Sequence, residues 1–254
     1  MYLLSLTQNA NSMLWVYIMC FARILGTMLI FPIFNSAYIN KTLKTLLALL
    51  FASIITPYEL QQISLVDNLF VNLSLVVKEF ILGAGLSYLL SFPFWMIENC
   101  GNLIDIQRGE QFGANFDPTM QHPSSSIAKL ILRAFIVYFI GMNGLLFFTE
   151  FIFNSFQLIP IDKFIPTLPI MNHNYYISFF TNYFKQMVML SLPVIFTMFI
   201  FEIILGLISS FIPQLNVTIL AMPIKSAIAL LFLTFYLAYI LHQGINQYAL
   251  HYSW

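Results

Sequence analysis

The sequence predicts an all-α membrane protein with about six apolar helices. Of its 254 residues, 60% are hydrophobic, 17% are aromatic and only 8% are charged, whereas about a quarter of a soluble domain is charged. Apolar runs close to the roughly 20 residues that cross a hydrocarbon core recur along the chain. The net charge is zero and the ten basic residues are scattered, which excludes a basic stripe for nucleic acid.

The expected helices follow one another as apolar runs. The first run carries Arg23 in its middle, the second is short and ends at Pro57, and the third is interrupted by Pro93. The fourth follows a proline and three serines, one of which is available as an N-cap. Only the residues PQLN separate the last two. The runs span residues 13–34, 43–56, 69–97, 127–158, 187–212 and 217–241.

We expect a single membrane-embedded domain over residues 1–254, because no internal repeat, low-complexity tract or soluble segment interrupts these runs. Two polar stretches connect the helices, at residues 101–126 and 159–184. The N-terminal MYLLSLTQNANS has neither a basic n-region nor a small-residue cleavage site. We therefore expect the first apolar run to be retained and not removed as a signal peptide.

Several charged side chains lie within or at the edges of the apolar runs. A charge at the bilayer centre costs about 2.5–3.5 kcal/mol on insertion scales. Two interpretations stay open: the side chains snorkel or pair across a bundle, or the helices pack against protein, including other subunits, more than against lipid. Glu202 and Lys225 are candidates for an interface or an intramembrane ion pair. The set is Arg23, Lys78, Glu79, Glu98, Arg133, Glu150, Glu202 and Lys225.

No constellation of residues in the sequence supports catalysis. The four histidines lie in loops or near the C-terminal end, without an H-E-x-x-H motif or a Cys/His cluster, which argues against a metal site. There is no G-x-S-x-G motif, no glycine-rich phosphate loop, and no serine or cysteine with an evident base. We therefore expect a protein that is not an enzyme and that has no cofactor.

A long polar segment, GNLIDIQRGEQFGANFDPTMQHPSSS at residues 101–126, lies between two apolar runs. If the preceding helix continues to residue 108, Asp105 and Arg108 can pair at i, i+3. A solvated helix end explains these charges equally well.

The second half of this segment reads as a structured loop. Gly109 and Gly113 provide a flexible exit from the helix, and Asp117 followed by Pro118 favours a turn. Non-helical backbone at membrane depth is tolerated only where it is buried in protein or lines an aqueous cavity. The segment is therefore the leading candidate for a functional loop.

Five stretches occur in an order and spacing that carry a family resemblance: FARILGTMLIFPIFNS (21–36), GNLIDIQRG (101–109) followed by Asp117 and Pro118, FNSFQLIP (153–160), LPVIFTMFIFEIILGLISSFIPQLN (192–216) and IKSAIALL (224–231). Together they resemble the T component of the type III secretion export apparatus, the SctT/SpaR/YscT family, which is related to flagellar FliR. The resemblance covers almost the whole chain. The N-P-T-H motif of the U component is absent, and the QRG and SFQLIP forms look closer to the virulence branch.

The resemblance implies a structural and gating subunit whose helices form bent hairpins packed into a hetero-oligomeric export gate. The gate would conduct unfolded proteins across the bacterial inner membrane, with this chain as a multi-pass subunit in the base of the secretion machine. The implied partners are the R, S and U components, transiently the unfolded secreted proteins, and membrane lipid.

By position, residues 109–123 correspond to the loop that contributes to the plug of the family's closed pore. Large adaptable side chains can close a pore and yield to a passing polypeptide; anchoring of each into the subunit's own core is an equal alternative. The residues assigned to the plug are Gly109, Phe112, Gly113, Phe116 and Met120, and those assigned to the loop base and to subunit contacts are Asp105, Gln107, Arg108, Asp117 and Pro118.

Two interpretations from other classes compete with this one. In a secondary transporter, an intramembrane carboxylate, namely Glu79, Glu98, Glu150 or Glu202, would bind the coupling ion. The absence of an inverted repeat and the small number of helices argue against that mechanism. An intramembrane enzyme is disfavoured by the missing catalytic constellation.

Overall fold

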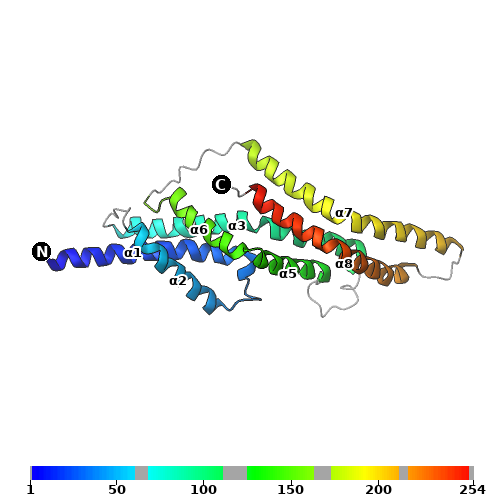
Figure 1. Cartoon of the computed structure of the whole chain (residues 1–254), viewed down its shortest axis with the longest axis horizontal. Helices are drawn as coiled ribbons and strands as arrows, with labels where there is room; N and C mark the ends of the chain where they lie inside the picture. Colours follow the sequence, from blue (N-terminus) through cyan, green and yellow to red (C-terminus); the bar gives the residue numbers. More distant parts are fainter. Residues whose placement is uncertain (1, 61–67, 111–124, 163–172, 212–216, 252–254) are drawn as a thin grey trace. The chain divides into compact units, whose positions relative to one another are not determined.

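Regular structure in this protein is helical throughout the part of the chain that the structure describes (Figure 1). The structure is a computed structural model, and it describes residues 2–60, 68–110, 125–162, 173–211 and 217–251. No strand occurs in these residues. The prediction of an all-α protein is therefore confirmed.

The chain divides into two compact units, each assembled from two separate stretches of sequence. The first unit is Met1–Phe92 with Asn143–Met171, and the second is Pro93–Met142 with Asn172–Trp254. Two of the three division points, at residues 92/93 and 142/143, fall inside runs that the sequence predicts as continuous apolar helices, and the third, at 171/172, falls in the polar connection 159–184.

The first unit contains α1 (Tyr2–Ile30), η1 (Pro32–Phe34), α2 (Lys41–Glu59), the first part of α3 (Leu69–Arg108) and α6 (Gly144–Leu158). Helix α1 contacts α2, α3 and α6. A close helix crossing holds α1 against α3, because a Cβ atom on Gly83 would lie 2.0 Å from the carbonyl oxygen of Arg23. Gly26 makes the reciprocal approach, where an added Cβ atom would lie 2.5 Å from the carbonyl oxygen of Phe80. Glycine is required at such a contact because any side chain would separate the two backbones.

Aromatic rings hold the end of α1 against α6 in this unit. The ring of Phe148 stacks on that of Phe31 with 4.6 Å between centroids and lies 5.3 Å from that of Phe34. All three side chains are buried. Offset and tilted aromatic pairs of this kind add to the free energy gained by burying their apolar area.

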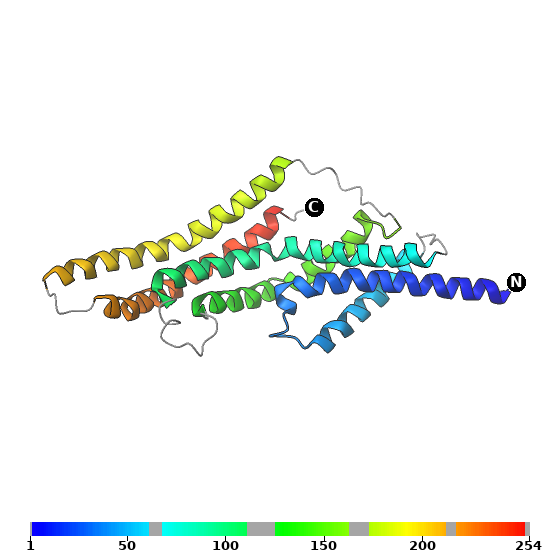
Figure 2. The ribbon, with the colours of Figure 1, turned by 180° about the vertical axis from the view of Figure 1, so that it is seen from behind.

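The second unit contains the rest of α3, α5 (Ser126–Gly141), α7 (His173–Phe211) and α8 (Val217–His251). Helices α7 and α8 run side by side in both ribbon views (Figures 1 and 2). Phe94 of α3 packs edge-on against Phe135 and Phe139 of α5, at 4.9 and 5.2 Å between ring centroids. A Cβ atom on Gly101 would lie 2.4 Å from the Cα of Ala128, so α3 and α5 also meet backbone to backbone.

The run at residues 127–158, predicted as one helix, is two helices. Helix α5 ends at Gly141, and α6 begins at Gly144 after Asn143, whose φ of 59° lies in the left-handed region. Asparagine tolerates this conformation better than most residues, and the flanking glycines weaken the helix on both sides. The single-helix prediction is wrong because GMNG acts as a helix stop.

Other helix boundaries also differ from the apolar runs. Helix α3 continues through the polar residues 101–108, and α7 begins at His173, inside the predicted polar connection 159–184. Polarity alone does not end a helix, since residues such as Gln, Arg and Asn on a solvated face still complete the backbone hydrogen bonds. The apolar runs therefore predicted the helix centres better than the helix ends.

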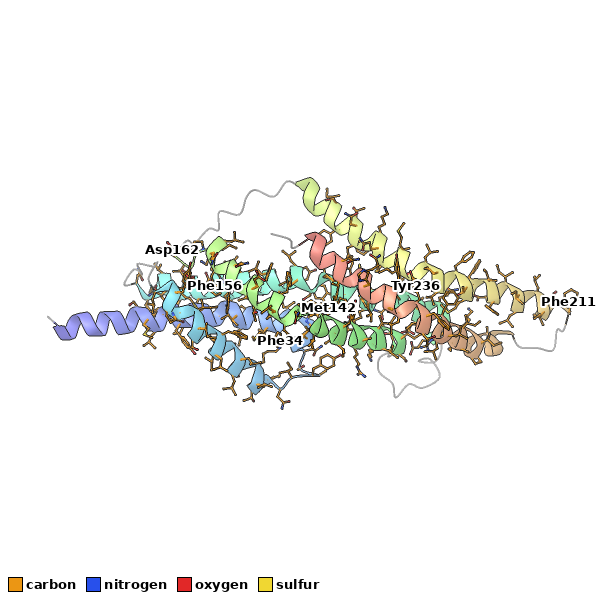
Figure 3. All side chains as sticks on the ribbon, in the orientation of Figure 1. Phe34, Met142, Phe156, Asp162, Phe211 and Tyr236 are labelled. Atoms are coloured by element: carbon orange, nitrogen blue, oxygen red, sulfur yellow. The ribbon has the colours of Figure 1, made fainter. Side chains whose placement is uncertain are left out.

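Four helices in the described part of the chain are long and apolar enough to cross a membrane, or five if the bent pair α5 and α6 counts as one span. This is fewer than the six predicted, because α2 does not qualify as a span. Large apolar side chains cover the outer faces of the helices; Phe211 and Phe235 are 84% and 82% exposed, and Figure 3 labels the former. Such surfaces suit lipid or other protein, so the chain is an all-α membrane protein.

Candidate functional site

The polar end of α3 and the first turn of α5 form a cluster that we call the loop-base cluster: Asp105, Arg108, Glu110 and residues 126–128. One oxygen of Asp105 accepts hydrogen bonds from the backbone N–H groups of Ile127 and Ala128, at 3.0 and 3.1 Å. The other lies 3.0 Å from Nη2 of Arg108. The i, i+3 pair predicted from the sequence is therefore present, with an additional role in capping α5.

Glu110 completes the loop-base cluster. Its Oε2 lies 2.8 Å from Nη2 of Arg108, and its Oε1 accepts a hydrogen bond of 2.6 Å from the hydroxyl of Ser126. The backbone N–H of Ser126 also points to this carboxylate, at 3.3 Å. Arg108 thus bridges two carboxylates, both of which bind the start of α5.

These two carboxylates replace the serine cap expected from the sequence. Ser125 occupies the N-cap position of α5 but makes no capping hydrogen bond with its side chain. Ionised oxygens accept stronger hydrogen bonds than a hydroxyl, and a negative charge at a helix N-terminus also interacts favourably with the helix dipole. The carboxylates of Asp105 and Glu110 therefore cap α5 from outside the helix.

Gly109 allows Glu110 to reach α5. Its φ is 88°, and its N–H donates to the carbonyl of Ile106 at 3.0 Å. A glycine in the left-handed region just after the last residue is a common helix ending. The assignment of Gly109 as the point where the loop leaves the helix agrees with this geometry.

The ion pair and hydrogen bonds hold Glu110 in its charged form. Burial acts to raise the pKa of Glu110, but the hydrogen bonds from Ser126 and Arg108 and the charge of Arg108 outweigh it and lower this pKa below its ordinary value. Glu110 therefore stays ionised at neutral pH and keeps its contacts with Arg108 and Ser126.

The contacts of Glu110 with Ser126 bring together the two ends of the segment between them. Residues 111–124 lie outside the described residues, and with them the predicted plug and turn residues. Those residues, whose roles stay predictions, are Phe112, Gly113, Phe116, Asp117, Pro118 and Met120.

A second polar group in this unit joins α3, α7 and α8. Nζ of Lys225 lies 2.7 Å from Oε2 of Glu202 and 3.4 Å from the carbonyl oxygen of Gln107. The side-chain amide of Gln107 donates to the same Glu202 oxygen at 3.3 Å. The predicted ion pair between Glu202 and Lys225 is present, and it binds the end of α3.

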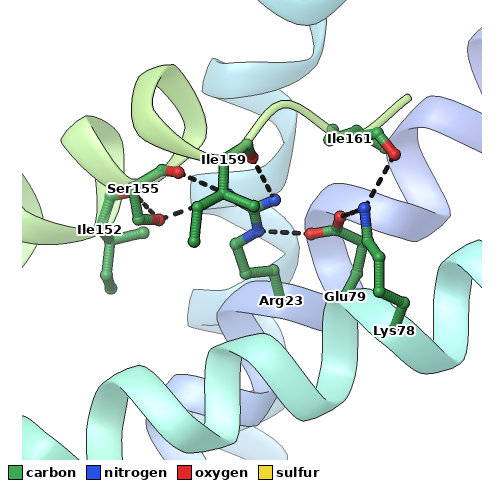
Figure 4. Close-up of polar contacts among 7 residues, drawn as sticks. All are labelled: Arg23, Lys78, Glu79, Ile152, Ser155, Ile159 and Ile161. Carbon is green, nitrogen blue, oxygen red and sulfur yellow. Dashed lines mark hydrogen bonds and ion pairs between the residues drawn. The ribbon is translucent and has the colours of Figure 1, made fainter. Parts of the chain in front are cut away.

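The first unit contains a buried charge cluster, made up of Arg23, Lys78 and Glu79 (Figure 4). Nε of Arg23 donates to Oε2 of Glu79, whose Oε1 lies 2.6 Å from Nζ of Lys78. Arg23 and Glu79 are completely buried. These three charges pair with one another, and the pair of Arg23 with Glu79 joins α1 to α3.

Backbone carbonyls in the last turn of α6 and just beyond it complete the coordination of both cations. Arg23 donates to the carbonyls of Ser155 and Ile159, at 2.9 and 2.7 Å, and Lys78 donates to that of Ile161 at 2.9 Å (Figure 4). The guanidinium carbon of Arg23 also lies 4.1 Å from the ring centroid of Phe156, a favourable cation–π distance. Burial of these charges is compensated because their donors have acceptors.

Two contributors escaped the sequence analysis. Glu110 was not singled out, although an acidic residue directly after a helix-ending glycine and ahead of a serine-rich helix start was a usable signal. The burial of Glu59, which lies close to the buried charge cluster, could not be predicted, because a single carboxylate at the edge of an apolar run is typical of a solvated helix end. Among the described residues, no group of three or more His, Cys, Asp or Glu could hold a metal ion.

The fold and the polar clusters together define a membrane-embedded helical protein in which ion pairs and hydrogen bonds join neighbouring helices. The chain matches the family model described as "Bacterial export proteins, family 1" over residues 14–249, and it belongs to that family. The predicted family is thereby confirmed. Family membership also confirms the prediction that the chain is not an enzyme, since this family consists of structural export components.

Individual relatives cover most of the chain. The "Yop proteins translocation protein T" of Yersinia pestis is 30% identical over 228 residues, which are 88% of this chain and 86% of that protein. The "Secretion system apparatus protein SsaT" of Salmonella typhimurium is 26% identical over 95% of this chain and 94% of its own length. The "Flagellar biosynthetic protein FliR" of Pectobacterium carotovorum is 26% identical over 89% and 87%.

Proposed function

We propose that this chain is a structural and gating subunit of a type III secretion export gate in the bacterial inner membrane. In this role it forms part of the channel through which unfolded substrate proteins pass. The relatives named for Yop translocation and for a secretion system apparatus support the assignment to a secretion machine. The observation that carries the gating role is the loop-base cluster, which closes the ends of residues 111–124.

A plug needs a fixed base and a deformable tip. The base is supplied by ionic hydrogen bonds of Asp105, Arg108 and Glu110 around the start of α5, and contacts of this kind are about twice as strong as neutral ones. The intervening segment contains only 14 residues, 111–124. In the proposed mechanism, these residues act as the plug, and the loop-base cluster holds their two flanking ends together.

The sequence of that loop suits a reversible seal. Phe112, Phe116 and Met120 recur every four residues among small and polar neighbours. Apolar side chains in a constriction block ions by excluding water, and the flexible thioether of methionine adapts to different surfaces. In the proposed closed state, these three side chains exclude water from the pore, and a substrate displaces them as it enters.

The proposed partners are the R, S and U components of the same apparatus. Eight of the 20 charged residues form ion pairs within the described part of the chain, and the outer faces of α7 and α8 are apolar. Subunits that bind here would do so through apolar packing with few charges, as in permanent complexes. Gln107 and Arg108, at the end of α3, are the proposed polar contacts for a neighbouring subunit.

The gating proposal is tested by the variant Phe112→Ala/Phe116→Ala/Met120→Ala. We expect cells expressing the assembled machine with this variant to leak ions across the inner membrane, because the apolar seal is removed while its base remains. A matched variant, Gln111→Ala/Asn115→Ala/Gln121→Ala, changes three polar residues of the same loop and should not leak. Equal and unchanged ion permeability in both variants, with normal secretion, would show that the loop is not the plug.

A further inference from the structure

Glu59 is a buried carboxyl group that forms no ion pair with any residue that the structure describes. It is the last residue of α2, its side chain is only 2% exposed, and its Oε1 has no hydrogen-bond partner among the described residues. No ion pair to Glu59 occurs in the same part of the chain. A carboxylate buried in this way is costly, since an ionised group needs pairing to offset its desolvation.

Arg23, the cation whose charge acts on Glu59, is already engaged. Arg23 directs its three nitrogens to Glu79, to the carbonyl and hydroxyl of Ser155 and to the carbonyl of Ile159. Its planar guanidinium has a fixed geometry, so it cannot turn toward Glu59 without giving up one of these acceptors. The neighbouring ammonium of Lys78 is likewise bound to Glu79 and to the carbonyl of Ile161.

The other groups that face Glu59 disfavour a negative charge. Glu79 on α3 and Asp162 after α6 are acidic, and the thiol of Cys20 on α1 is neutral and buried. Arg23 and Lys78 both already pair with Glu79, so a charge on Glu59 would be an additional negative charge beside that carboxylate and near Asp162.

The position of Glu59 at the end of its helix acts in the same direction. The last turn of a helix carries the negative end of the helix dipole, which repels an anion. Burial raises the pKa of Glu59, Glu79 and Asp162 raise it further, and the charge of Arg23 offsets only part of this effect. Geometry and electrostatics therefore both favour the neutral carboxylic acid.

We propose that Glu59 is a proton-binding site, protonated while residues 159–162, here called the strap, are bound to Arg23 and Lys78. This goes beyond the proposed gating role, because the site lies in the first unit and uses none of the loop-base residues. Loss of the proton to water would leave a carboxylate that competes with the Ser155 and Ile159 carbonyls for Arg23. The strap would then lose its strongest contact, so proton occupancy controls how tightly the strap is held.

The protonation is tested by infrared difference spectroscopy of the full-length chain in its purified complex. A protonated carboxyl group has a C=O stretching band that a carboxylate lacks. At neutral pH we expect Glu59→Gln to remove one such band from the wild-type spectrum. The control Glu150→Gln, which changes an exposed carboxylate on α6 of the same unit, should remove none. A spectrum in which Glu59→Gln removes only carboxylate intensity overturns the proposal.

The coupling to the strap is tested by hydrogen exchange of the amides at residues 155–162, corrected for the intrinsic effect of pH. We expect protection to fall as the pH rises in the wild type and in Glu150→Gln. It should stay constant in Glu59→Gln, because glutamine keeps the neutral form at every pH. The same fall in all three proteins would show that Glu59 does not control the strap.

Discussion

The crossing of α1 and α3 at Gly83 allows a quantitative test of how the buried charge cluster is held. In Gly83→Ala the new Cβ would lie 2.0 Å from the carbonyl oxygen of Arg23, whereas ordinary contact begins at 3.4 Å, so the helices must separate by about 1.4 Å. The atom that is met is backbone, which cannot rotate away. We expect a cost near the upper end of the overpacking range, about 3 kcal/mol.

The gain in helix propensity from glycine to alanine offsets about 1 kcal/mol of this cost, which leaves a net destabilisation of about 2 kcal/mol. For a chain of this size, that lowers the melting temperature by about 4–8 °C. Thermal unfolding in detergent measures the shift. Gly85, two residues further along α3, provides the control, because nothing lies within 4 Å of a Cβ placed there.

The control variant Gly85→Ala should melt at the wild-type temperature or slightly above it, since it gains helix propensity without a clash. Separation of the helices should also weaken the ion pair of Arg23 with Glu79, because both side chains lie next to the crossing. If Gly83→Ala melts at or above the temperature of Gly85→Ala, the described approach of α1 and α3 is wrong.

Two further predictions concern the charged clusters. Arg23→Met and Glu79→Gln each remove one partner of a buried pair, so each should lower the free energy of unfolding by about 3 kcal/mol or more. In the same unfolding assay, the double variant should lose much less than the sum of the two single losses. Additive losses would show that the two charges do not interact. Glu110 has a pKa below its ordinary value of 4.5, so its stabilising contacts are complete above that value and are lost as the pH falls through the lowered pKa. Hydrogen exchange at the Ser126 amide should therefore lose protection in acid in the wild type, and Glu110→Gln should show weak protection at every pH; wild-type protection that does not change in acid would contradict the role of Glu110.

Composition and local spacing predicted those features of the protein that depend on neighbouring residues. The all-α membrane class follows from the apolar runs, and the pair of Asp105 with Arg108 follows from their i, i+3 spacing. The break at GMNG also carries a local signal, because asparagine and glycine both tolerate the left-handed conformation that Asn143 adopts. In each case the signal lies within one or two helical turns.

Contacts between distant helices could not be read in the same way. Asp105 caps α5 from 22 residues away, and Arg23 finds Glu79 across 56 residues. Each of these contacts depends on a glycine crossing, at Gly101 or Gly83, that sets which side chains face each other. The sequence shows that Arg23, Glu79 and Asp105 are unusual charges for a membrane helix. It does not show which residue each charge contacts, because that depends on how distant helices pack.

The central claim is that residues 111–124, closed at their base by Asp105, Arg108 and Glu110, plug a protein-conducting pore. Ion conductance of the purified export complex in a planar bilayer tests it most directly. We expect a closed pore in the wild type and in Gln111→Ala/Asn115→Ala/Gln121→Ala, and a persistent conductance in Phe112→Ala/Phe116→Ala/Met120→Ala. A pore that stays closed in the last variant, or that opens equally in both variants, would contradict it.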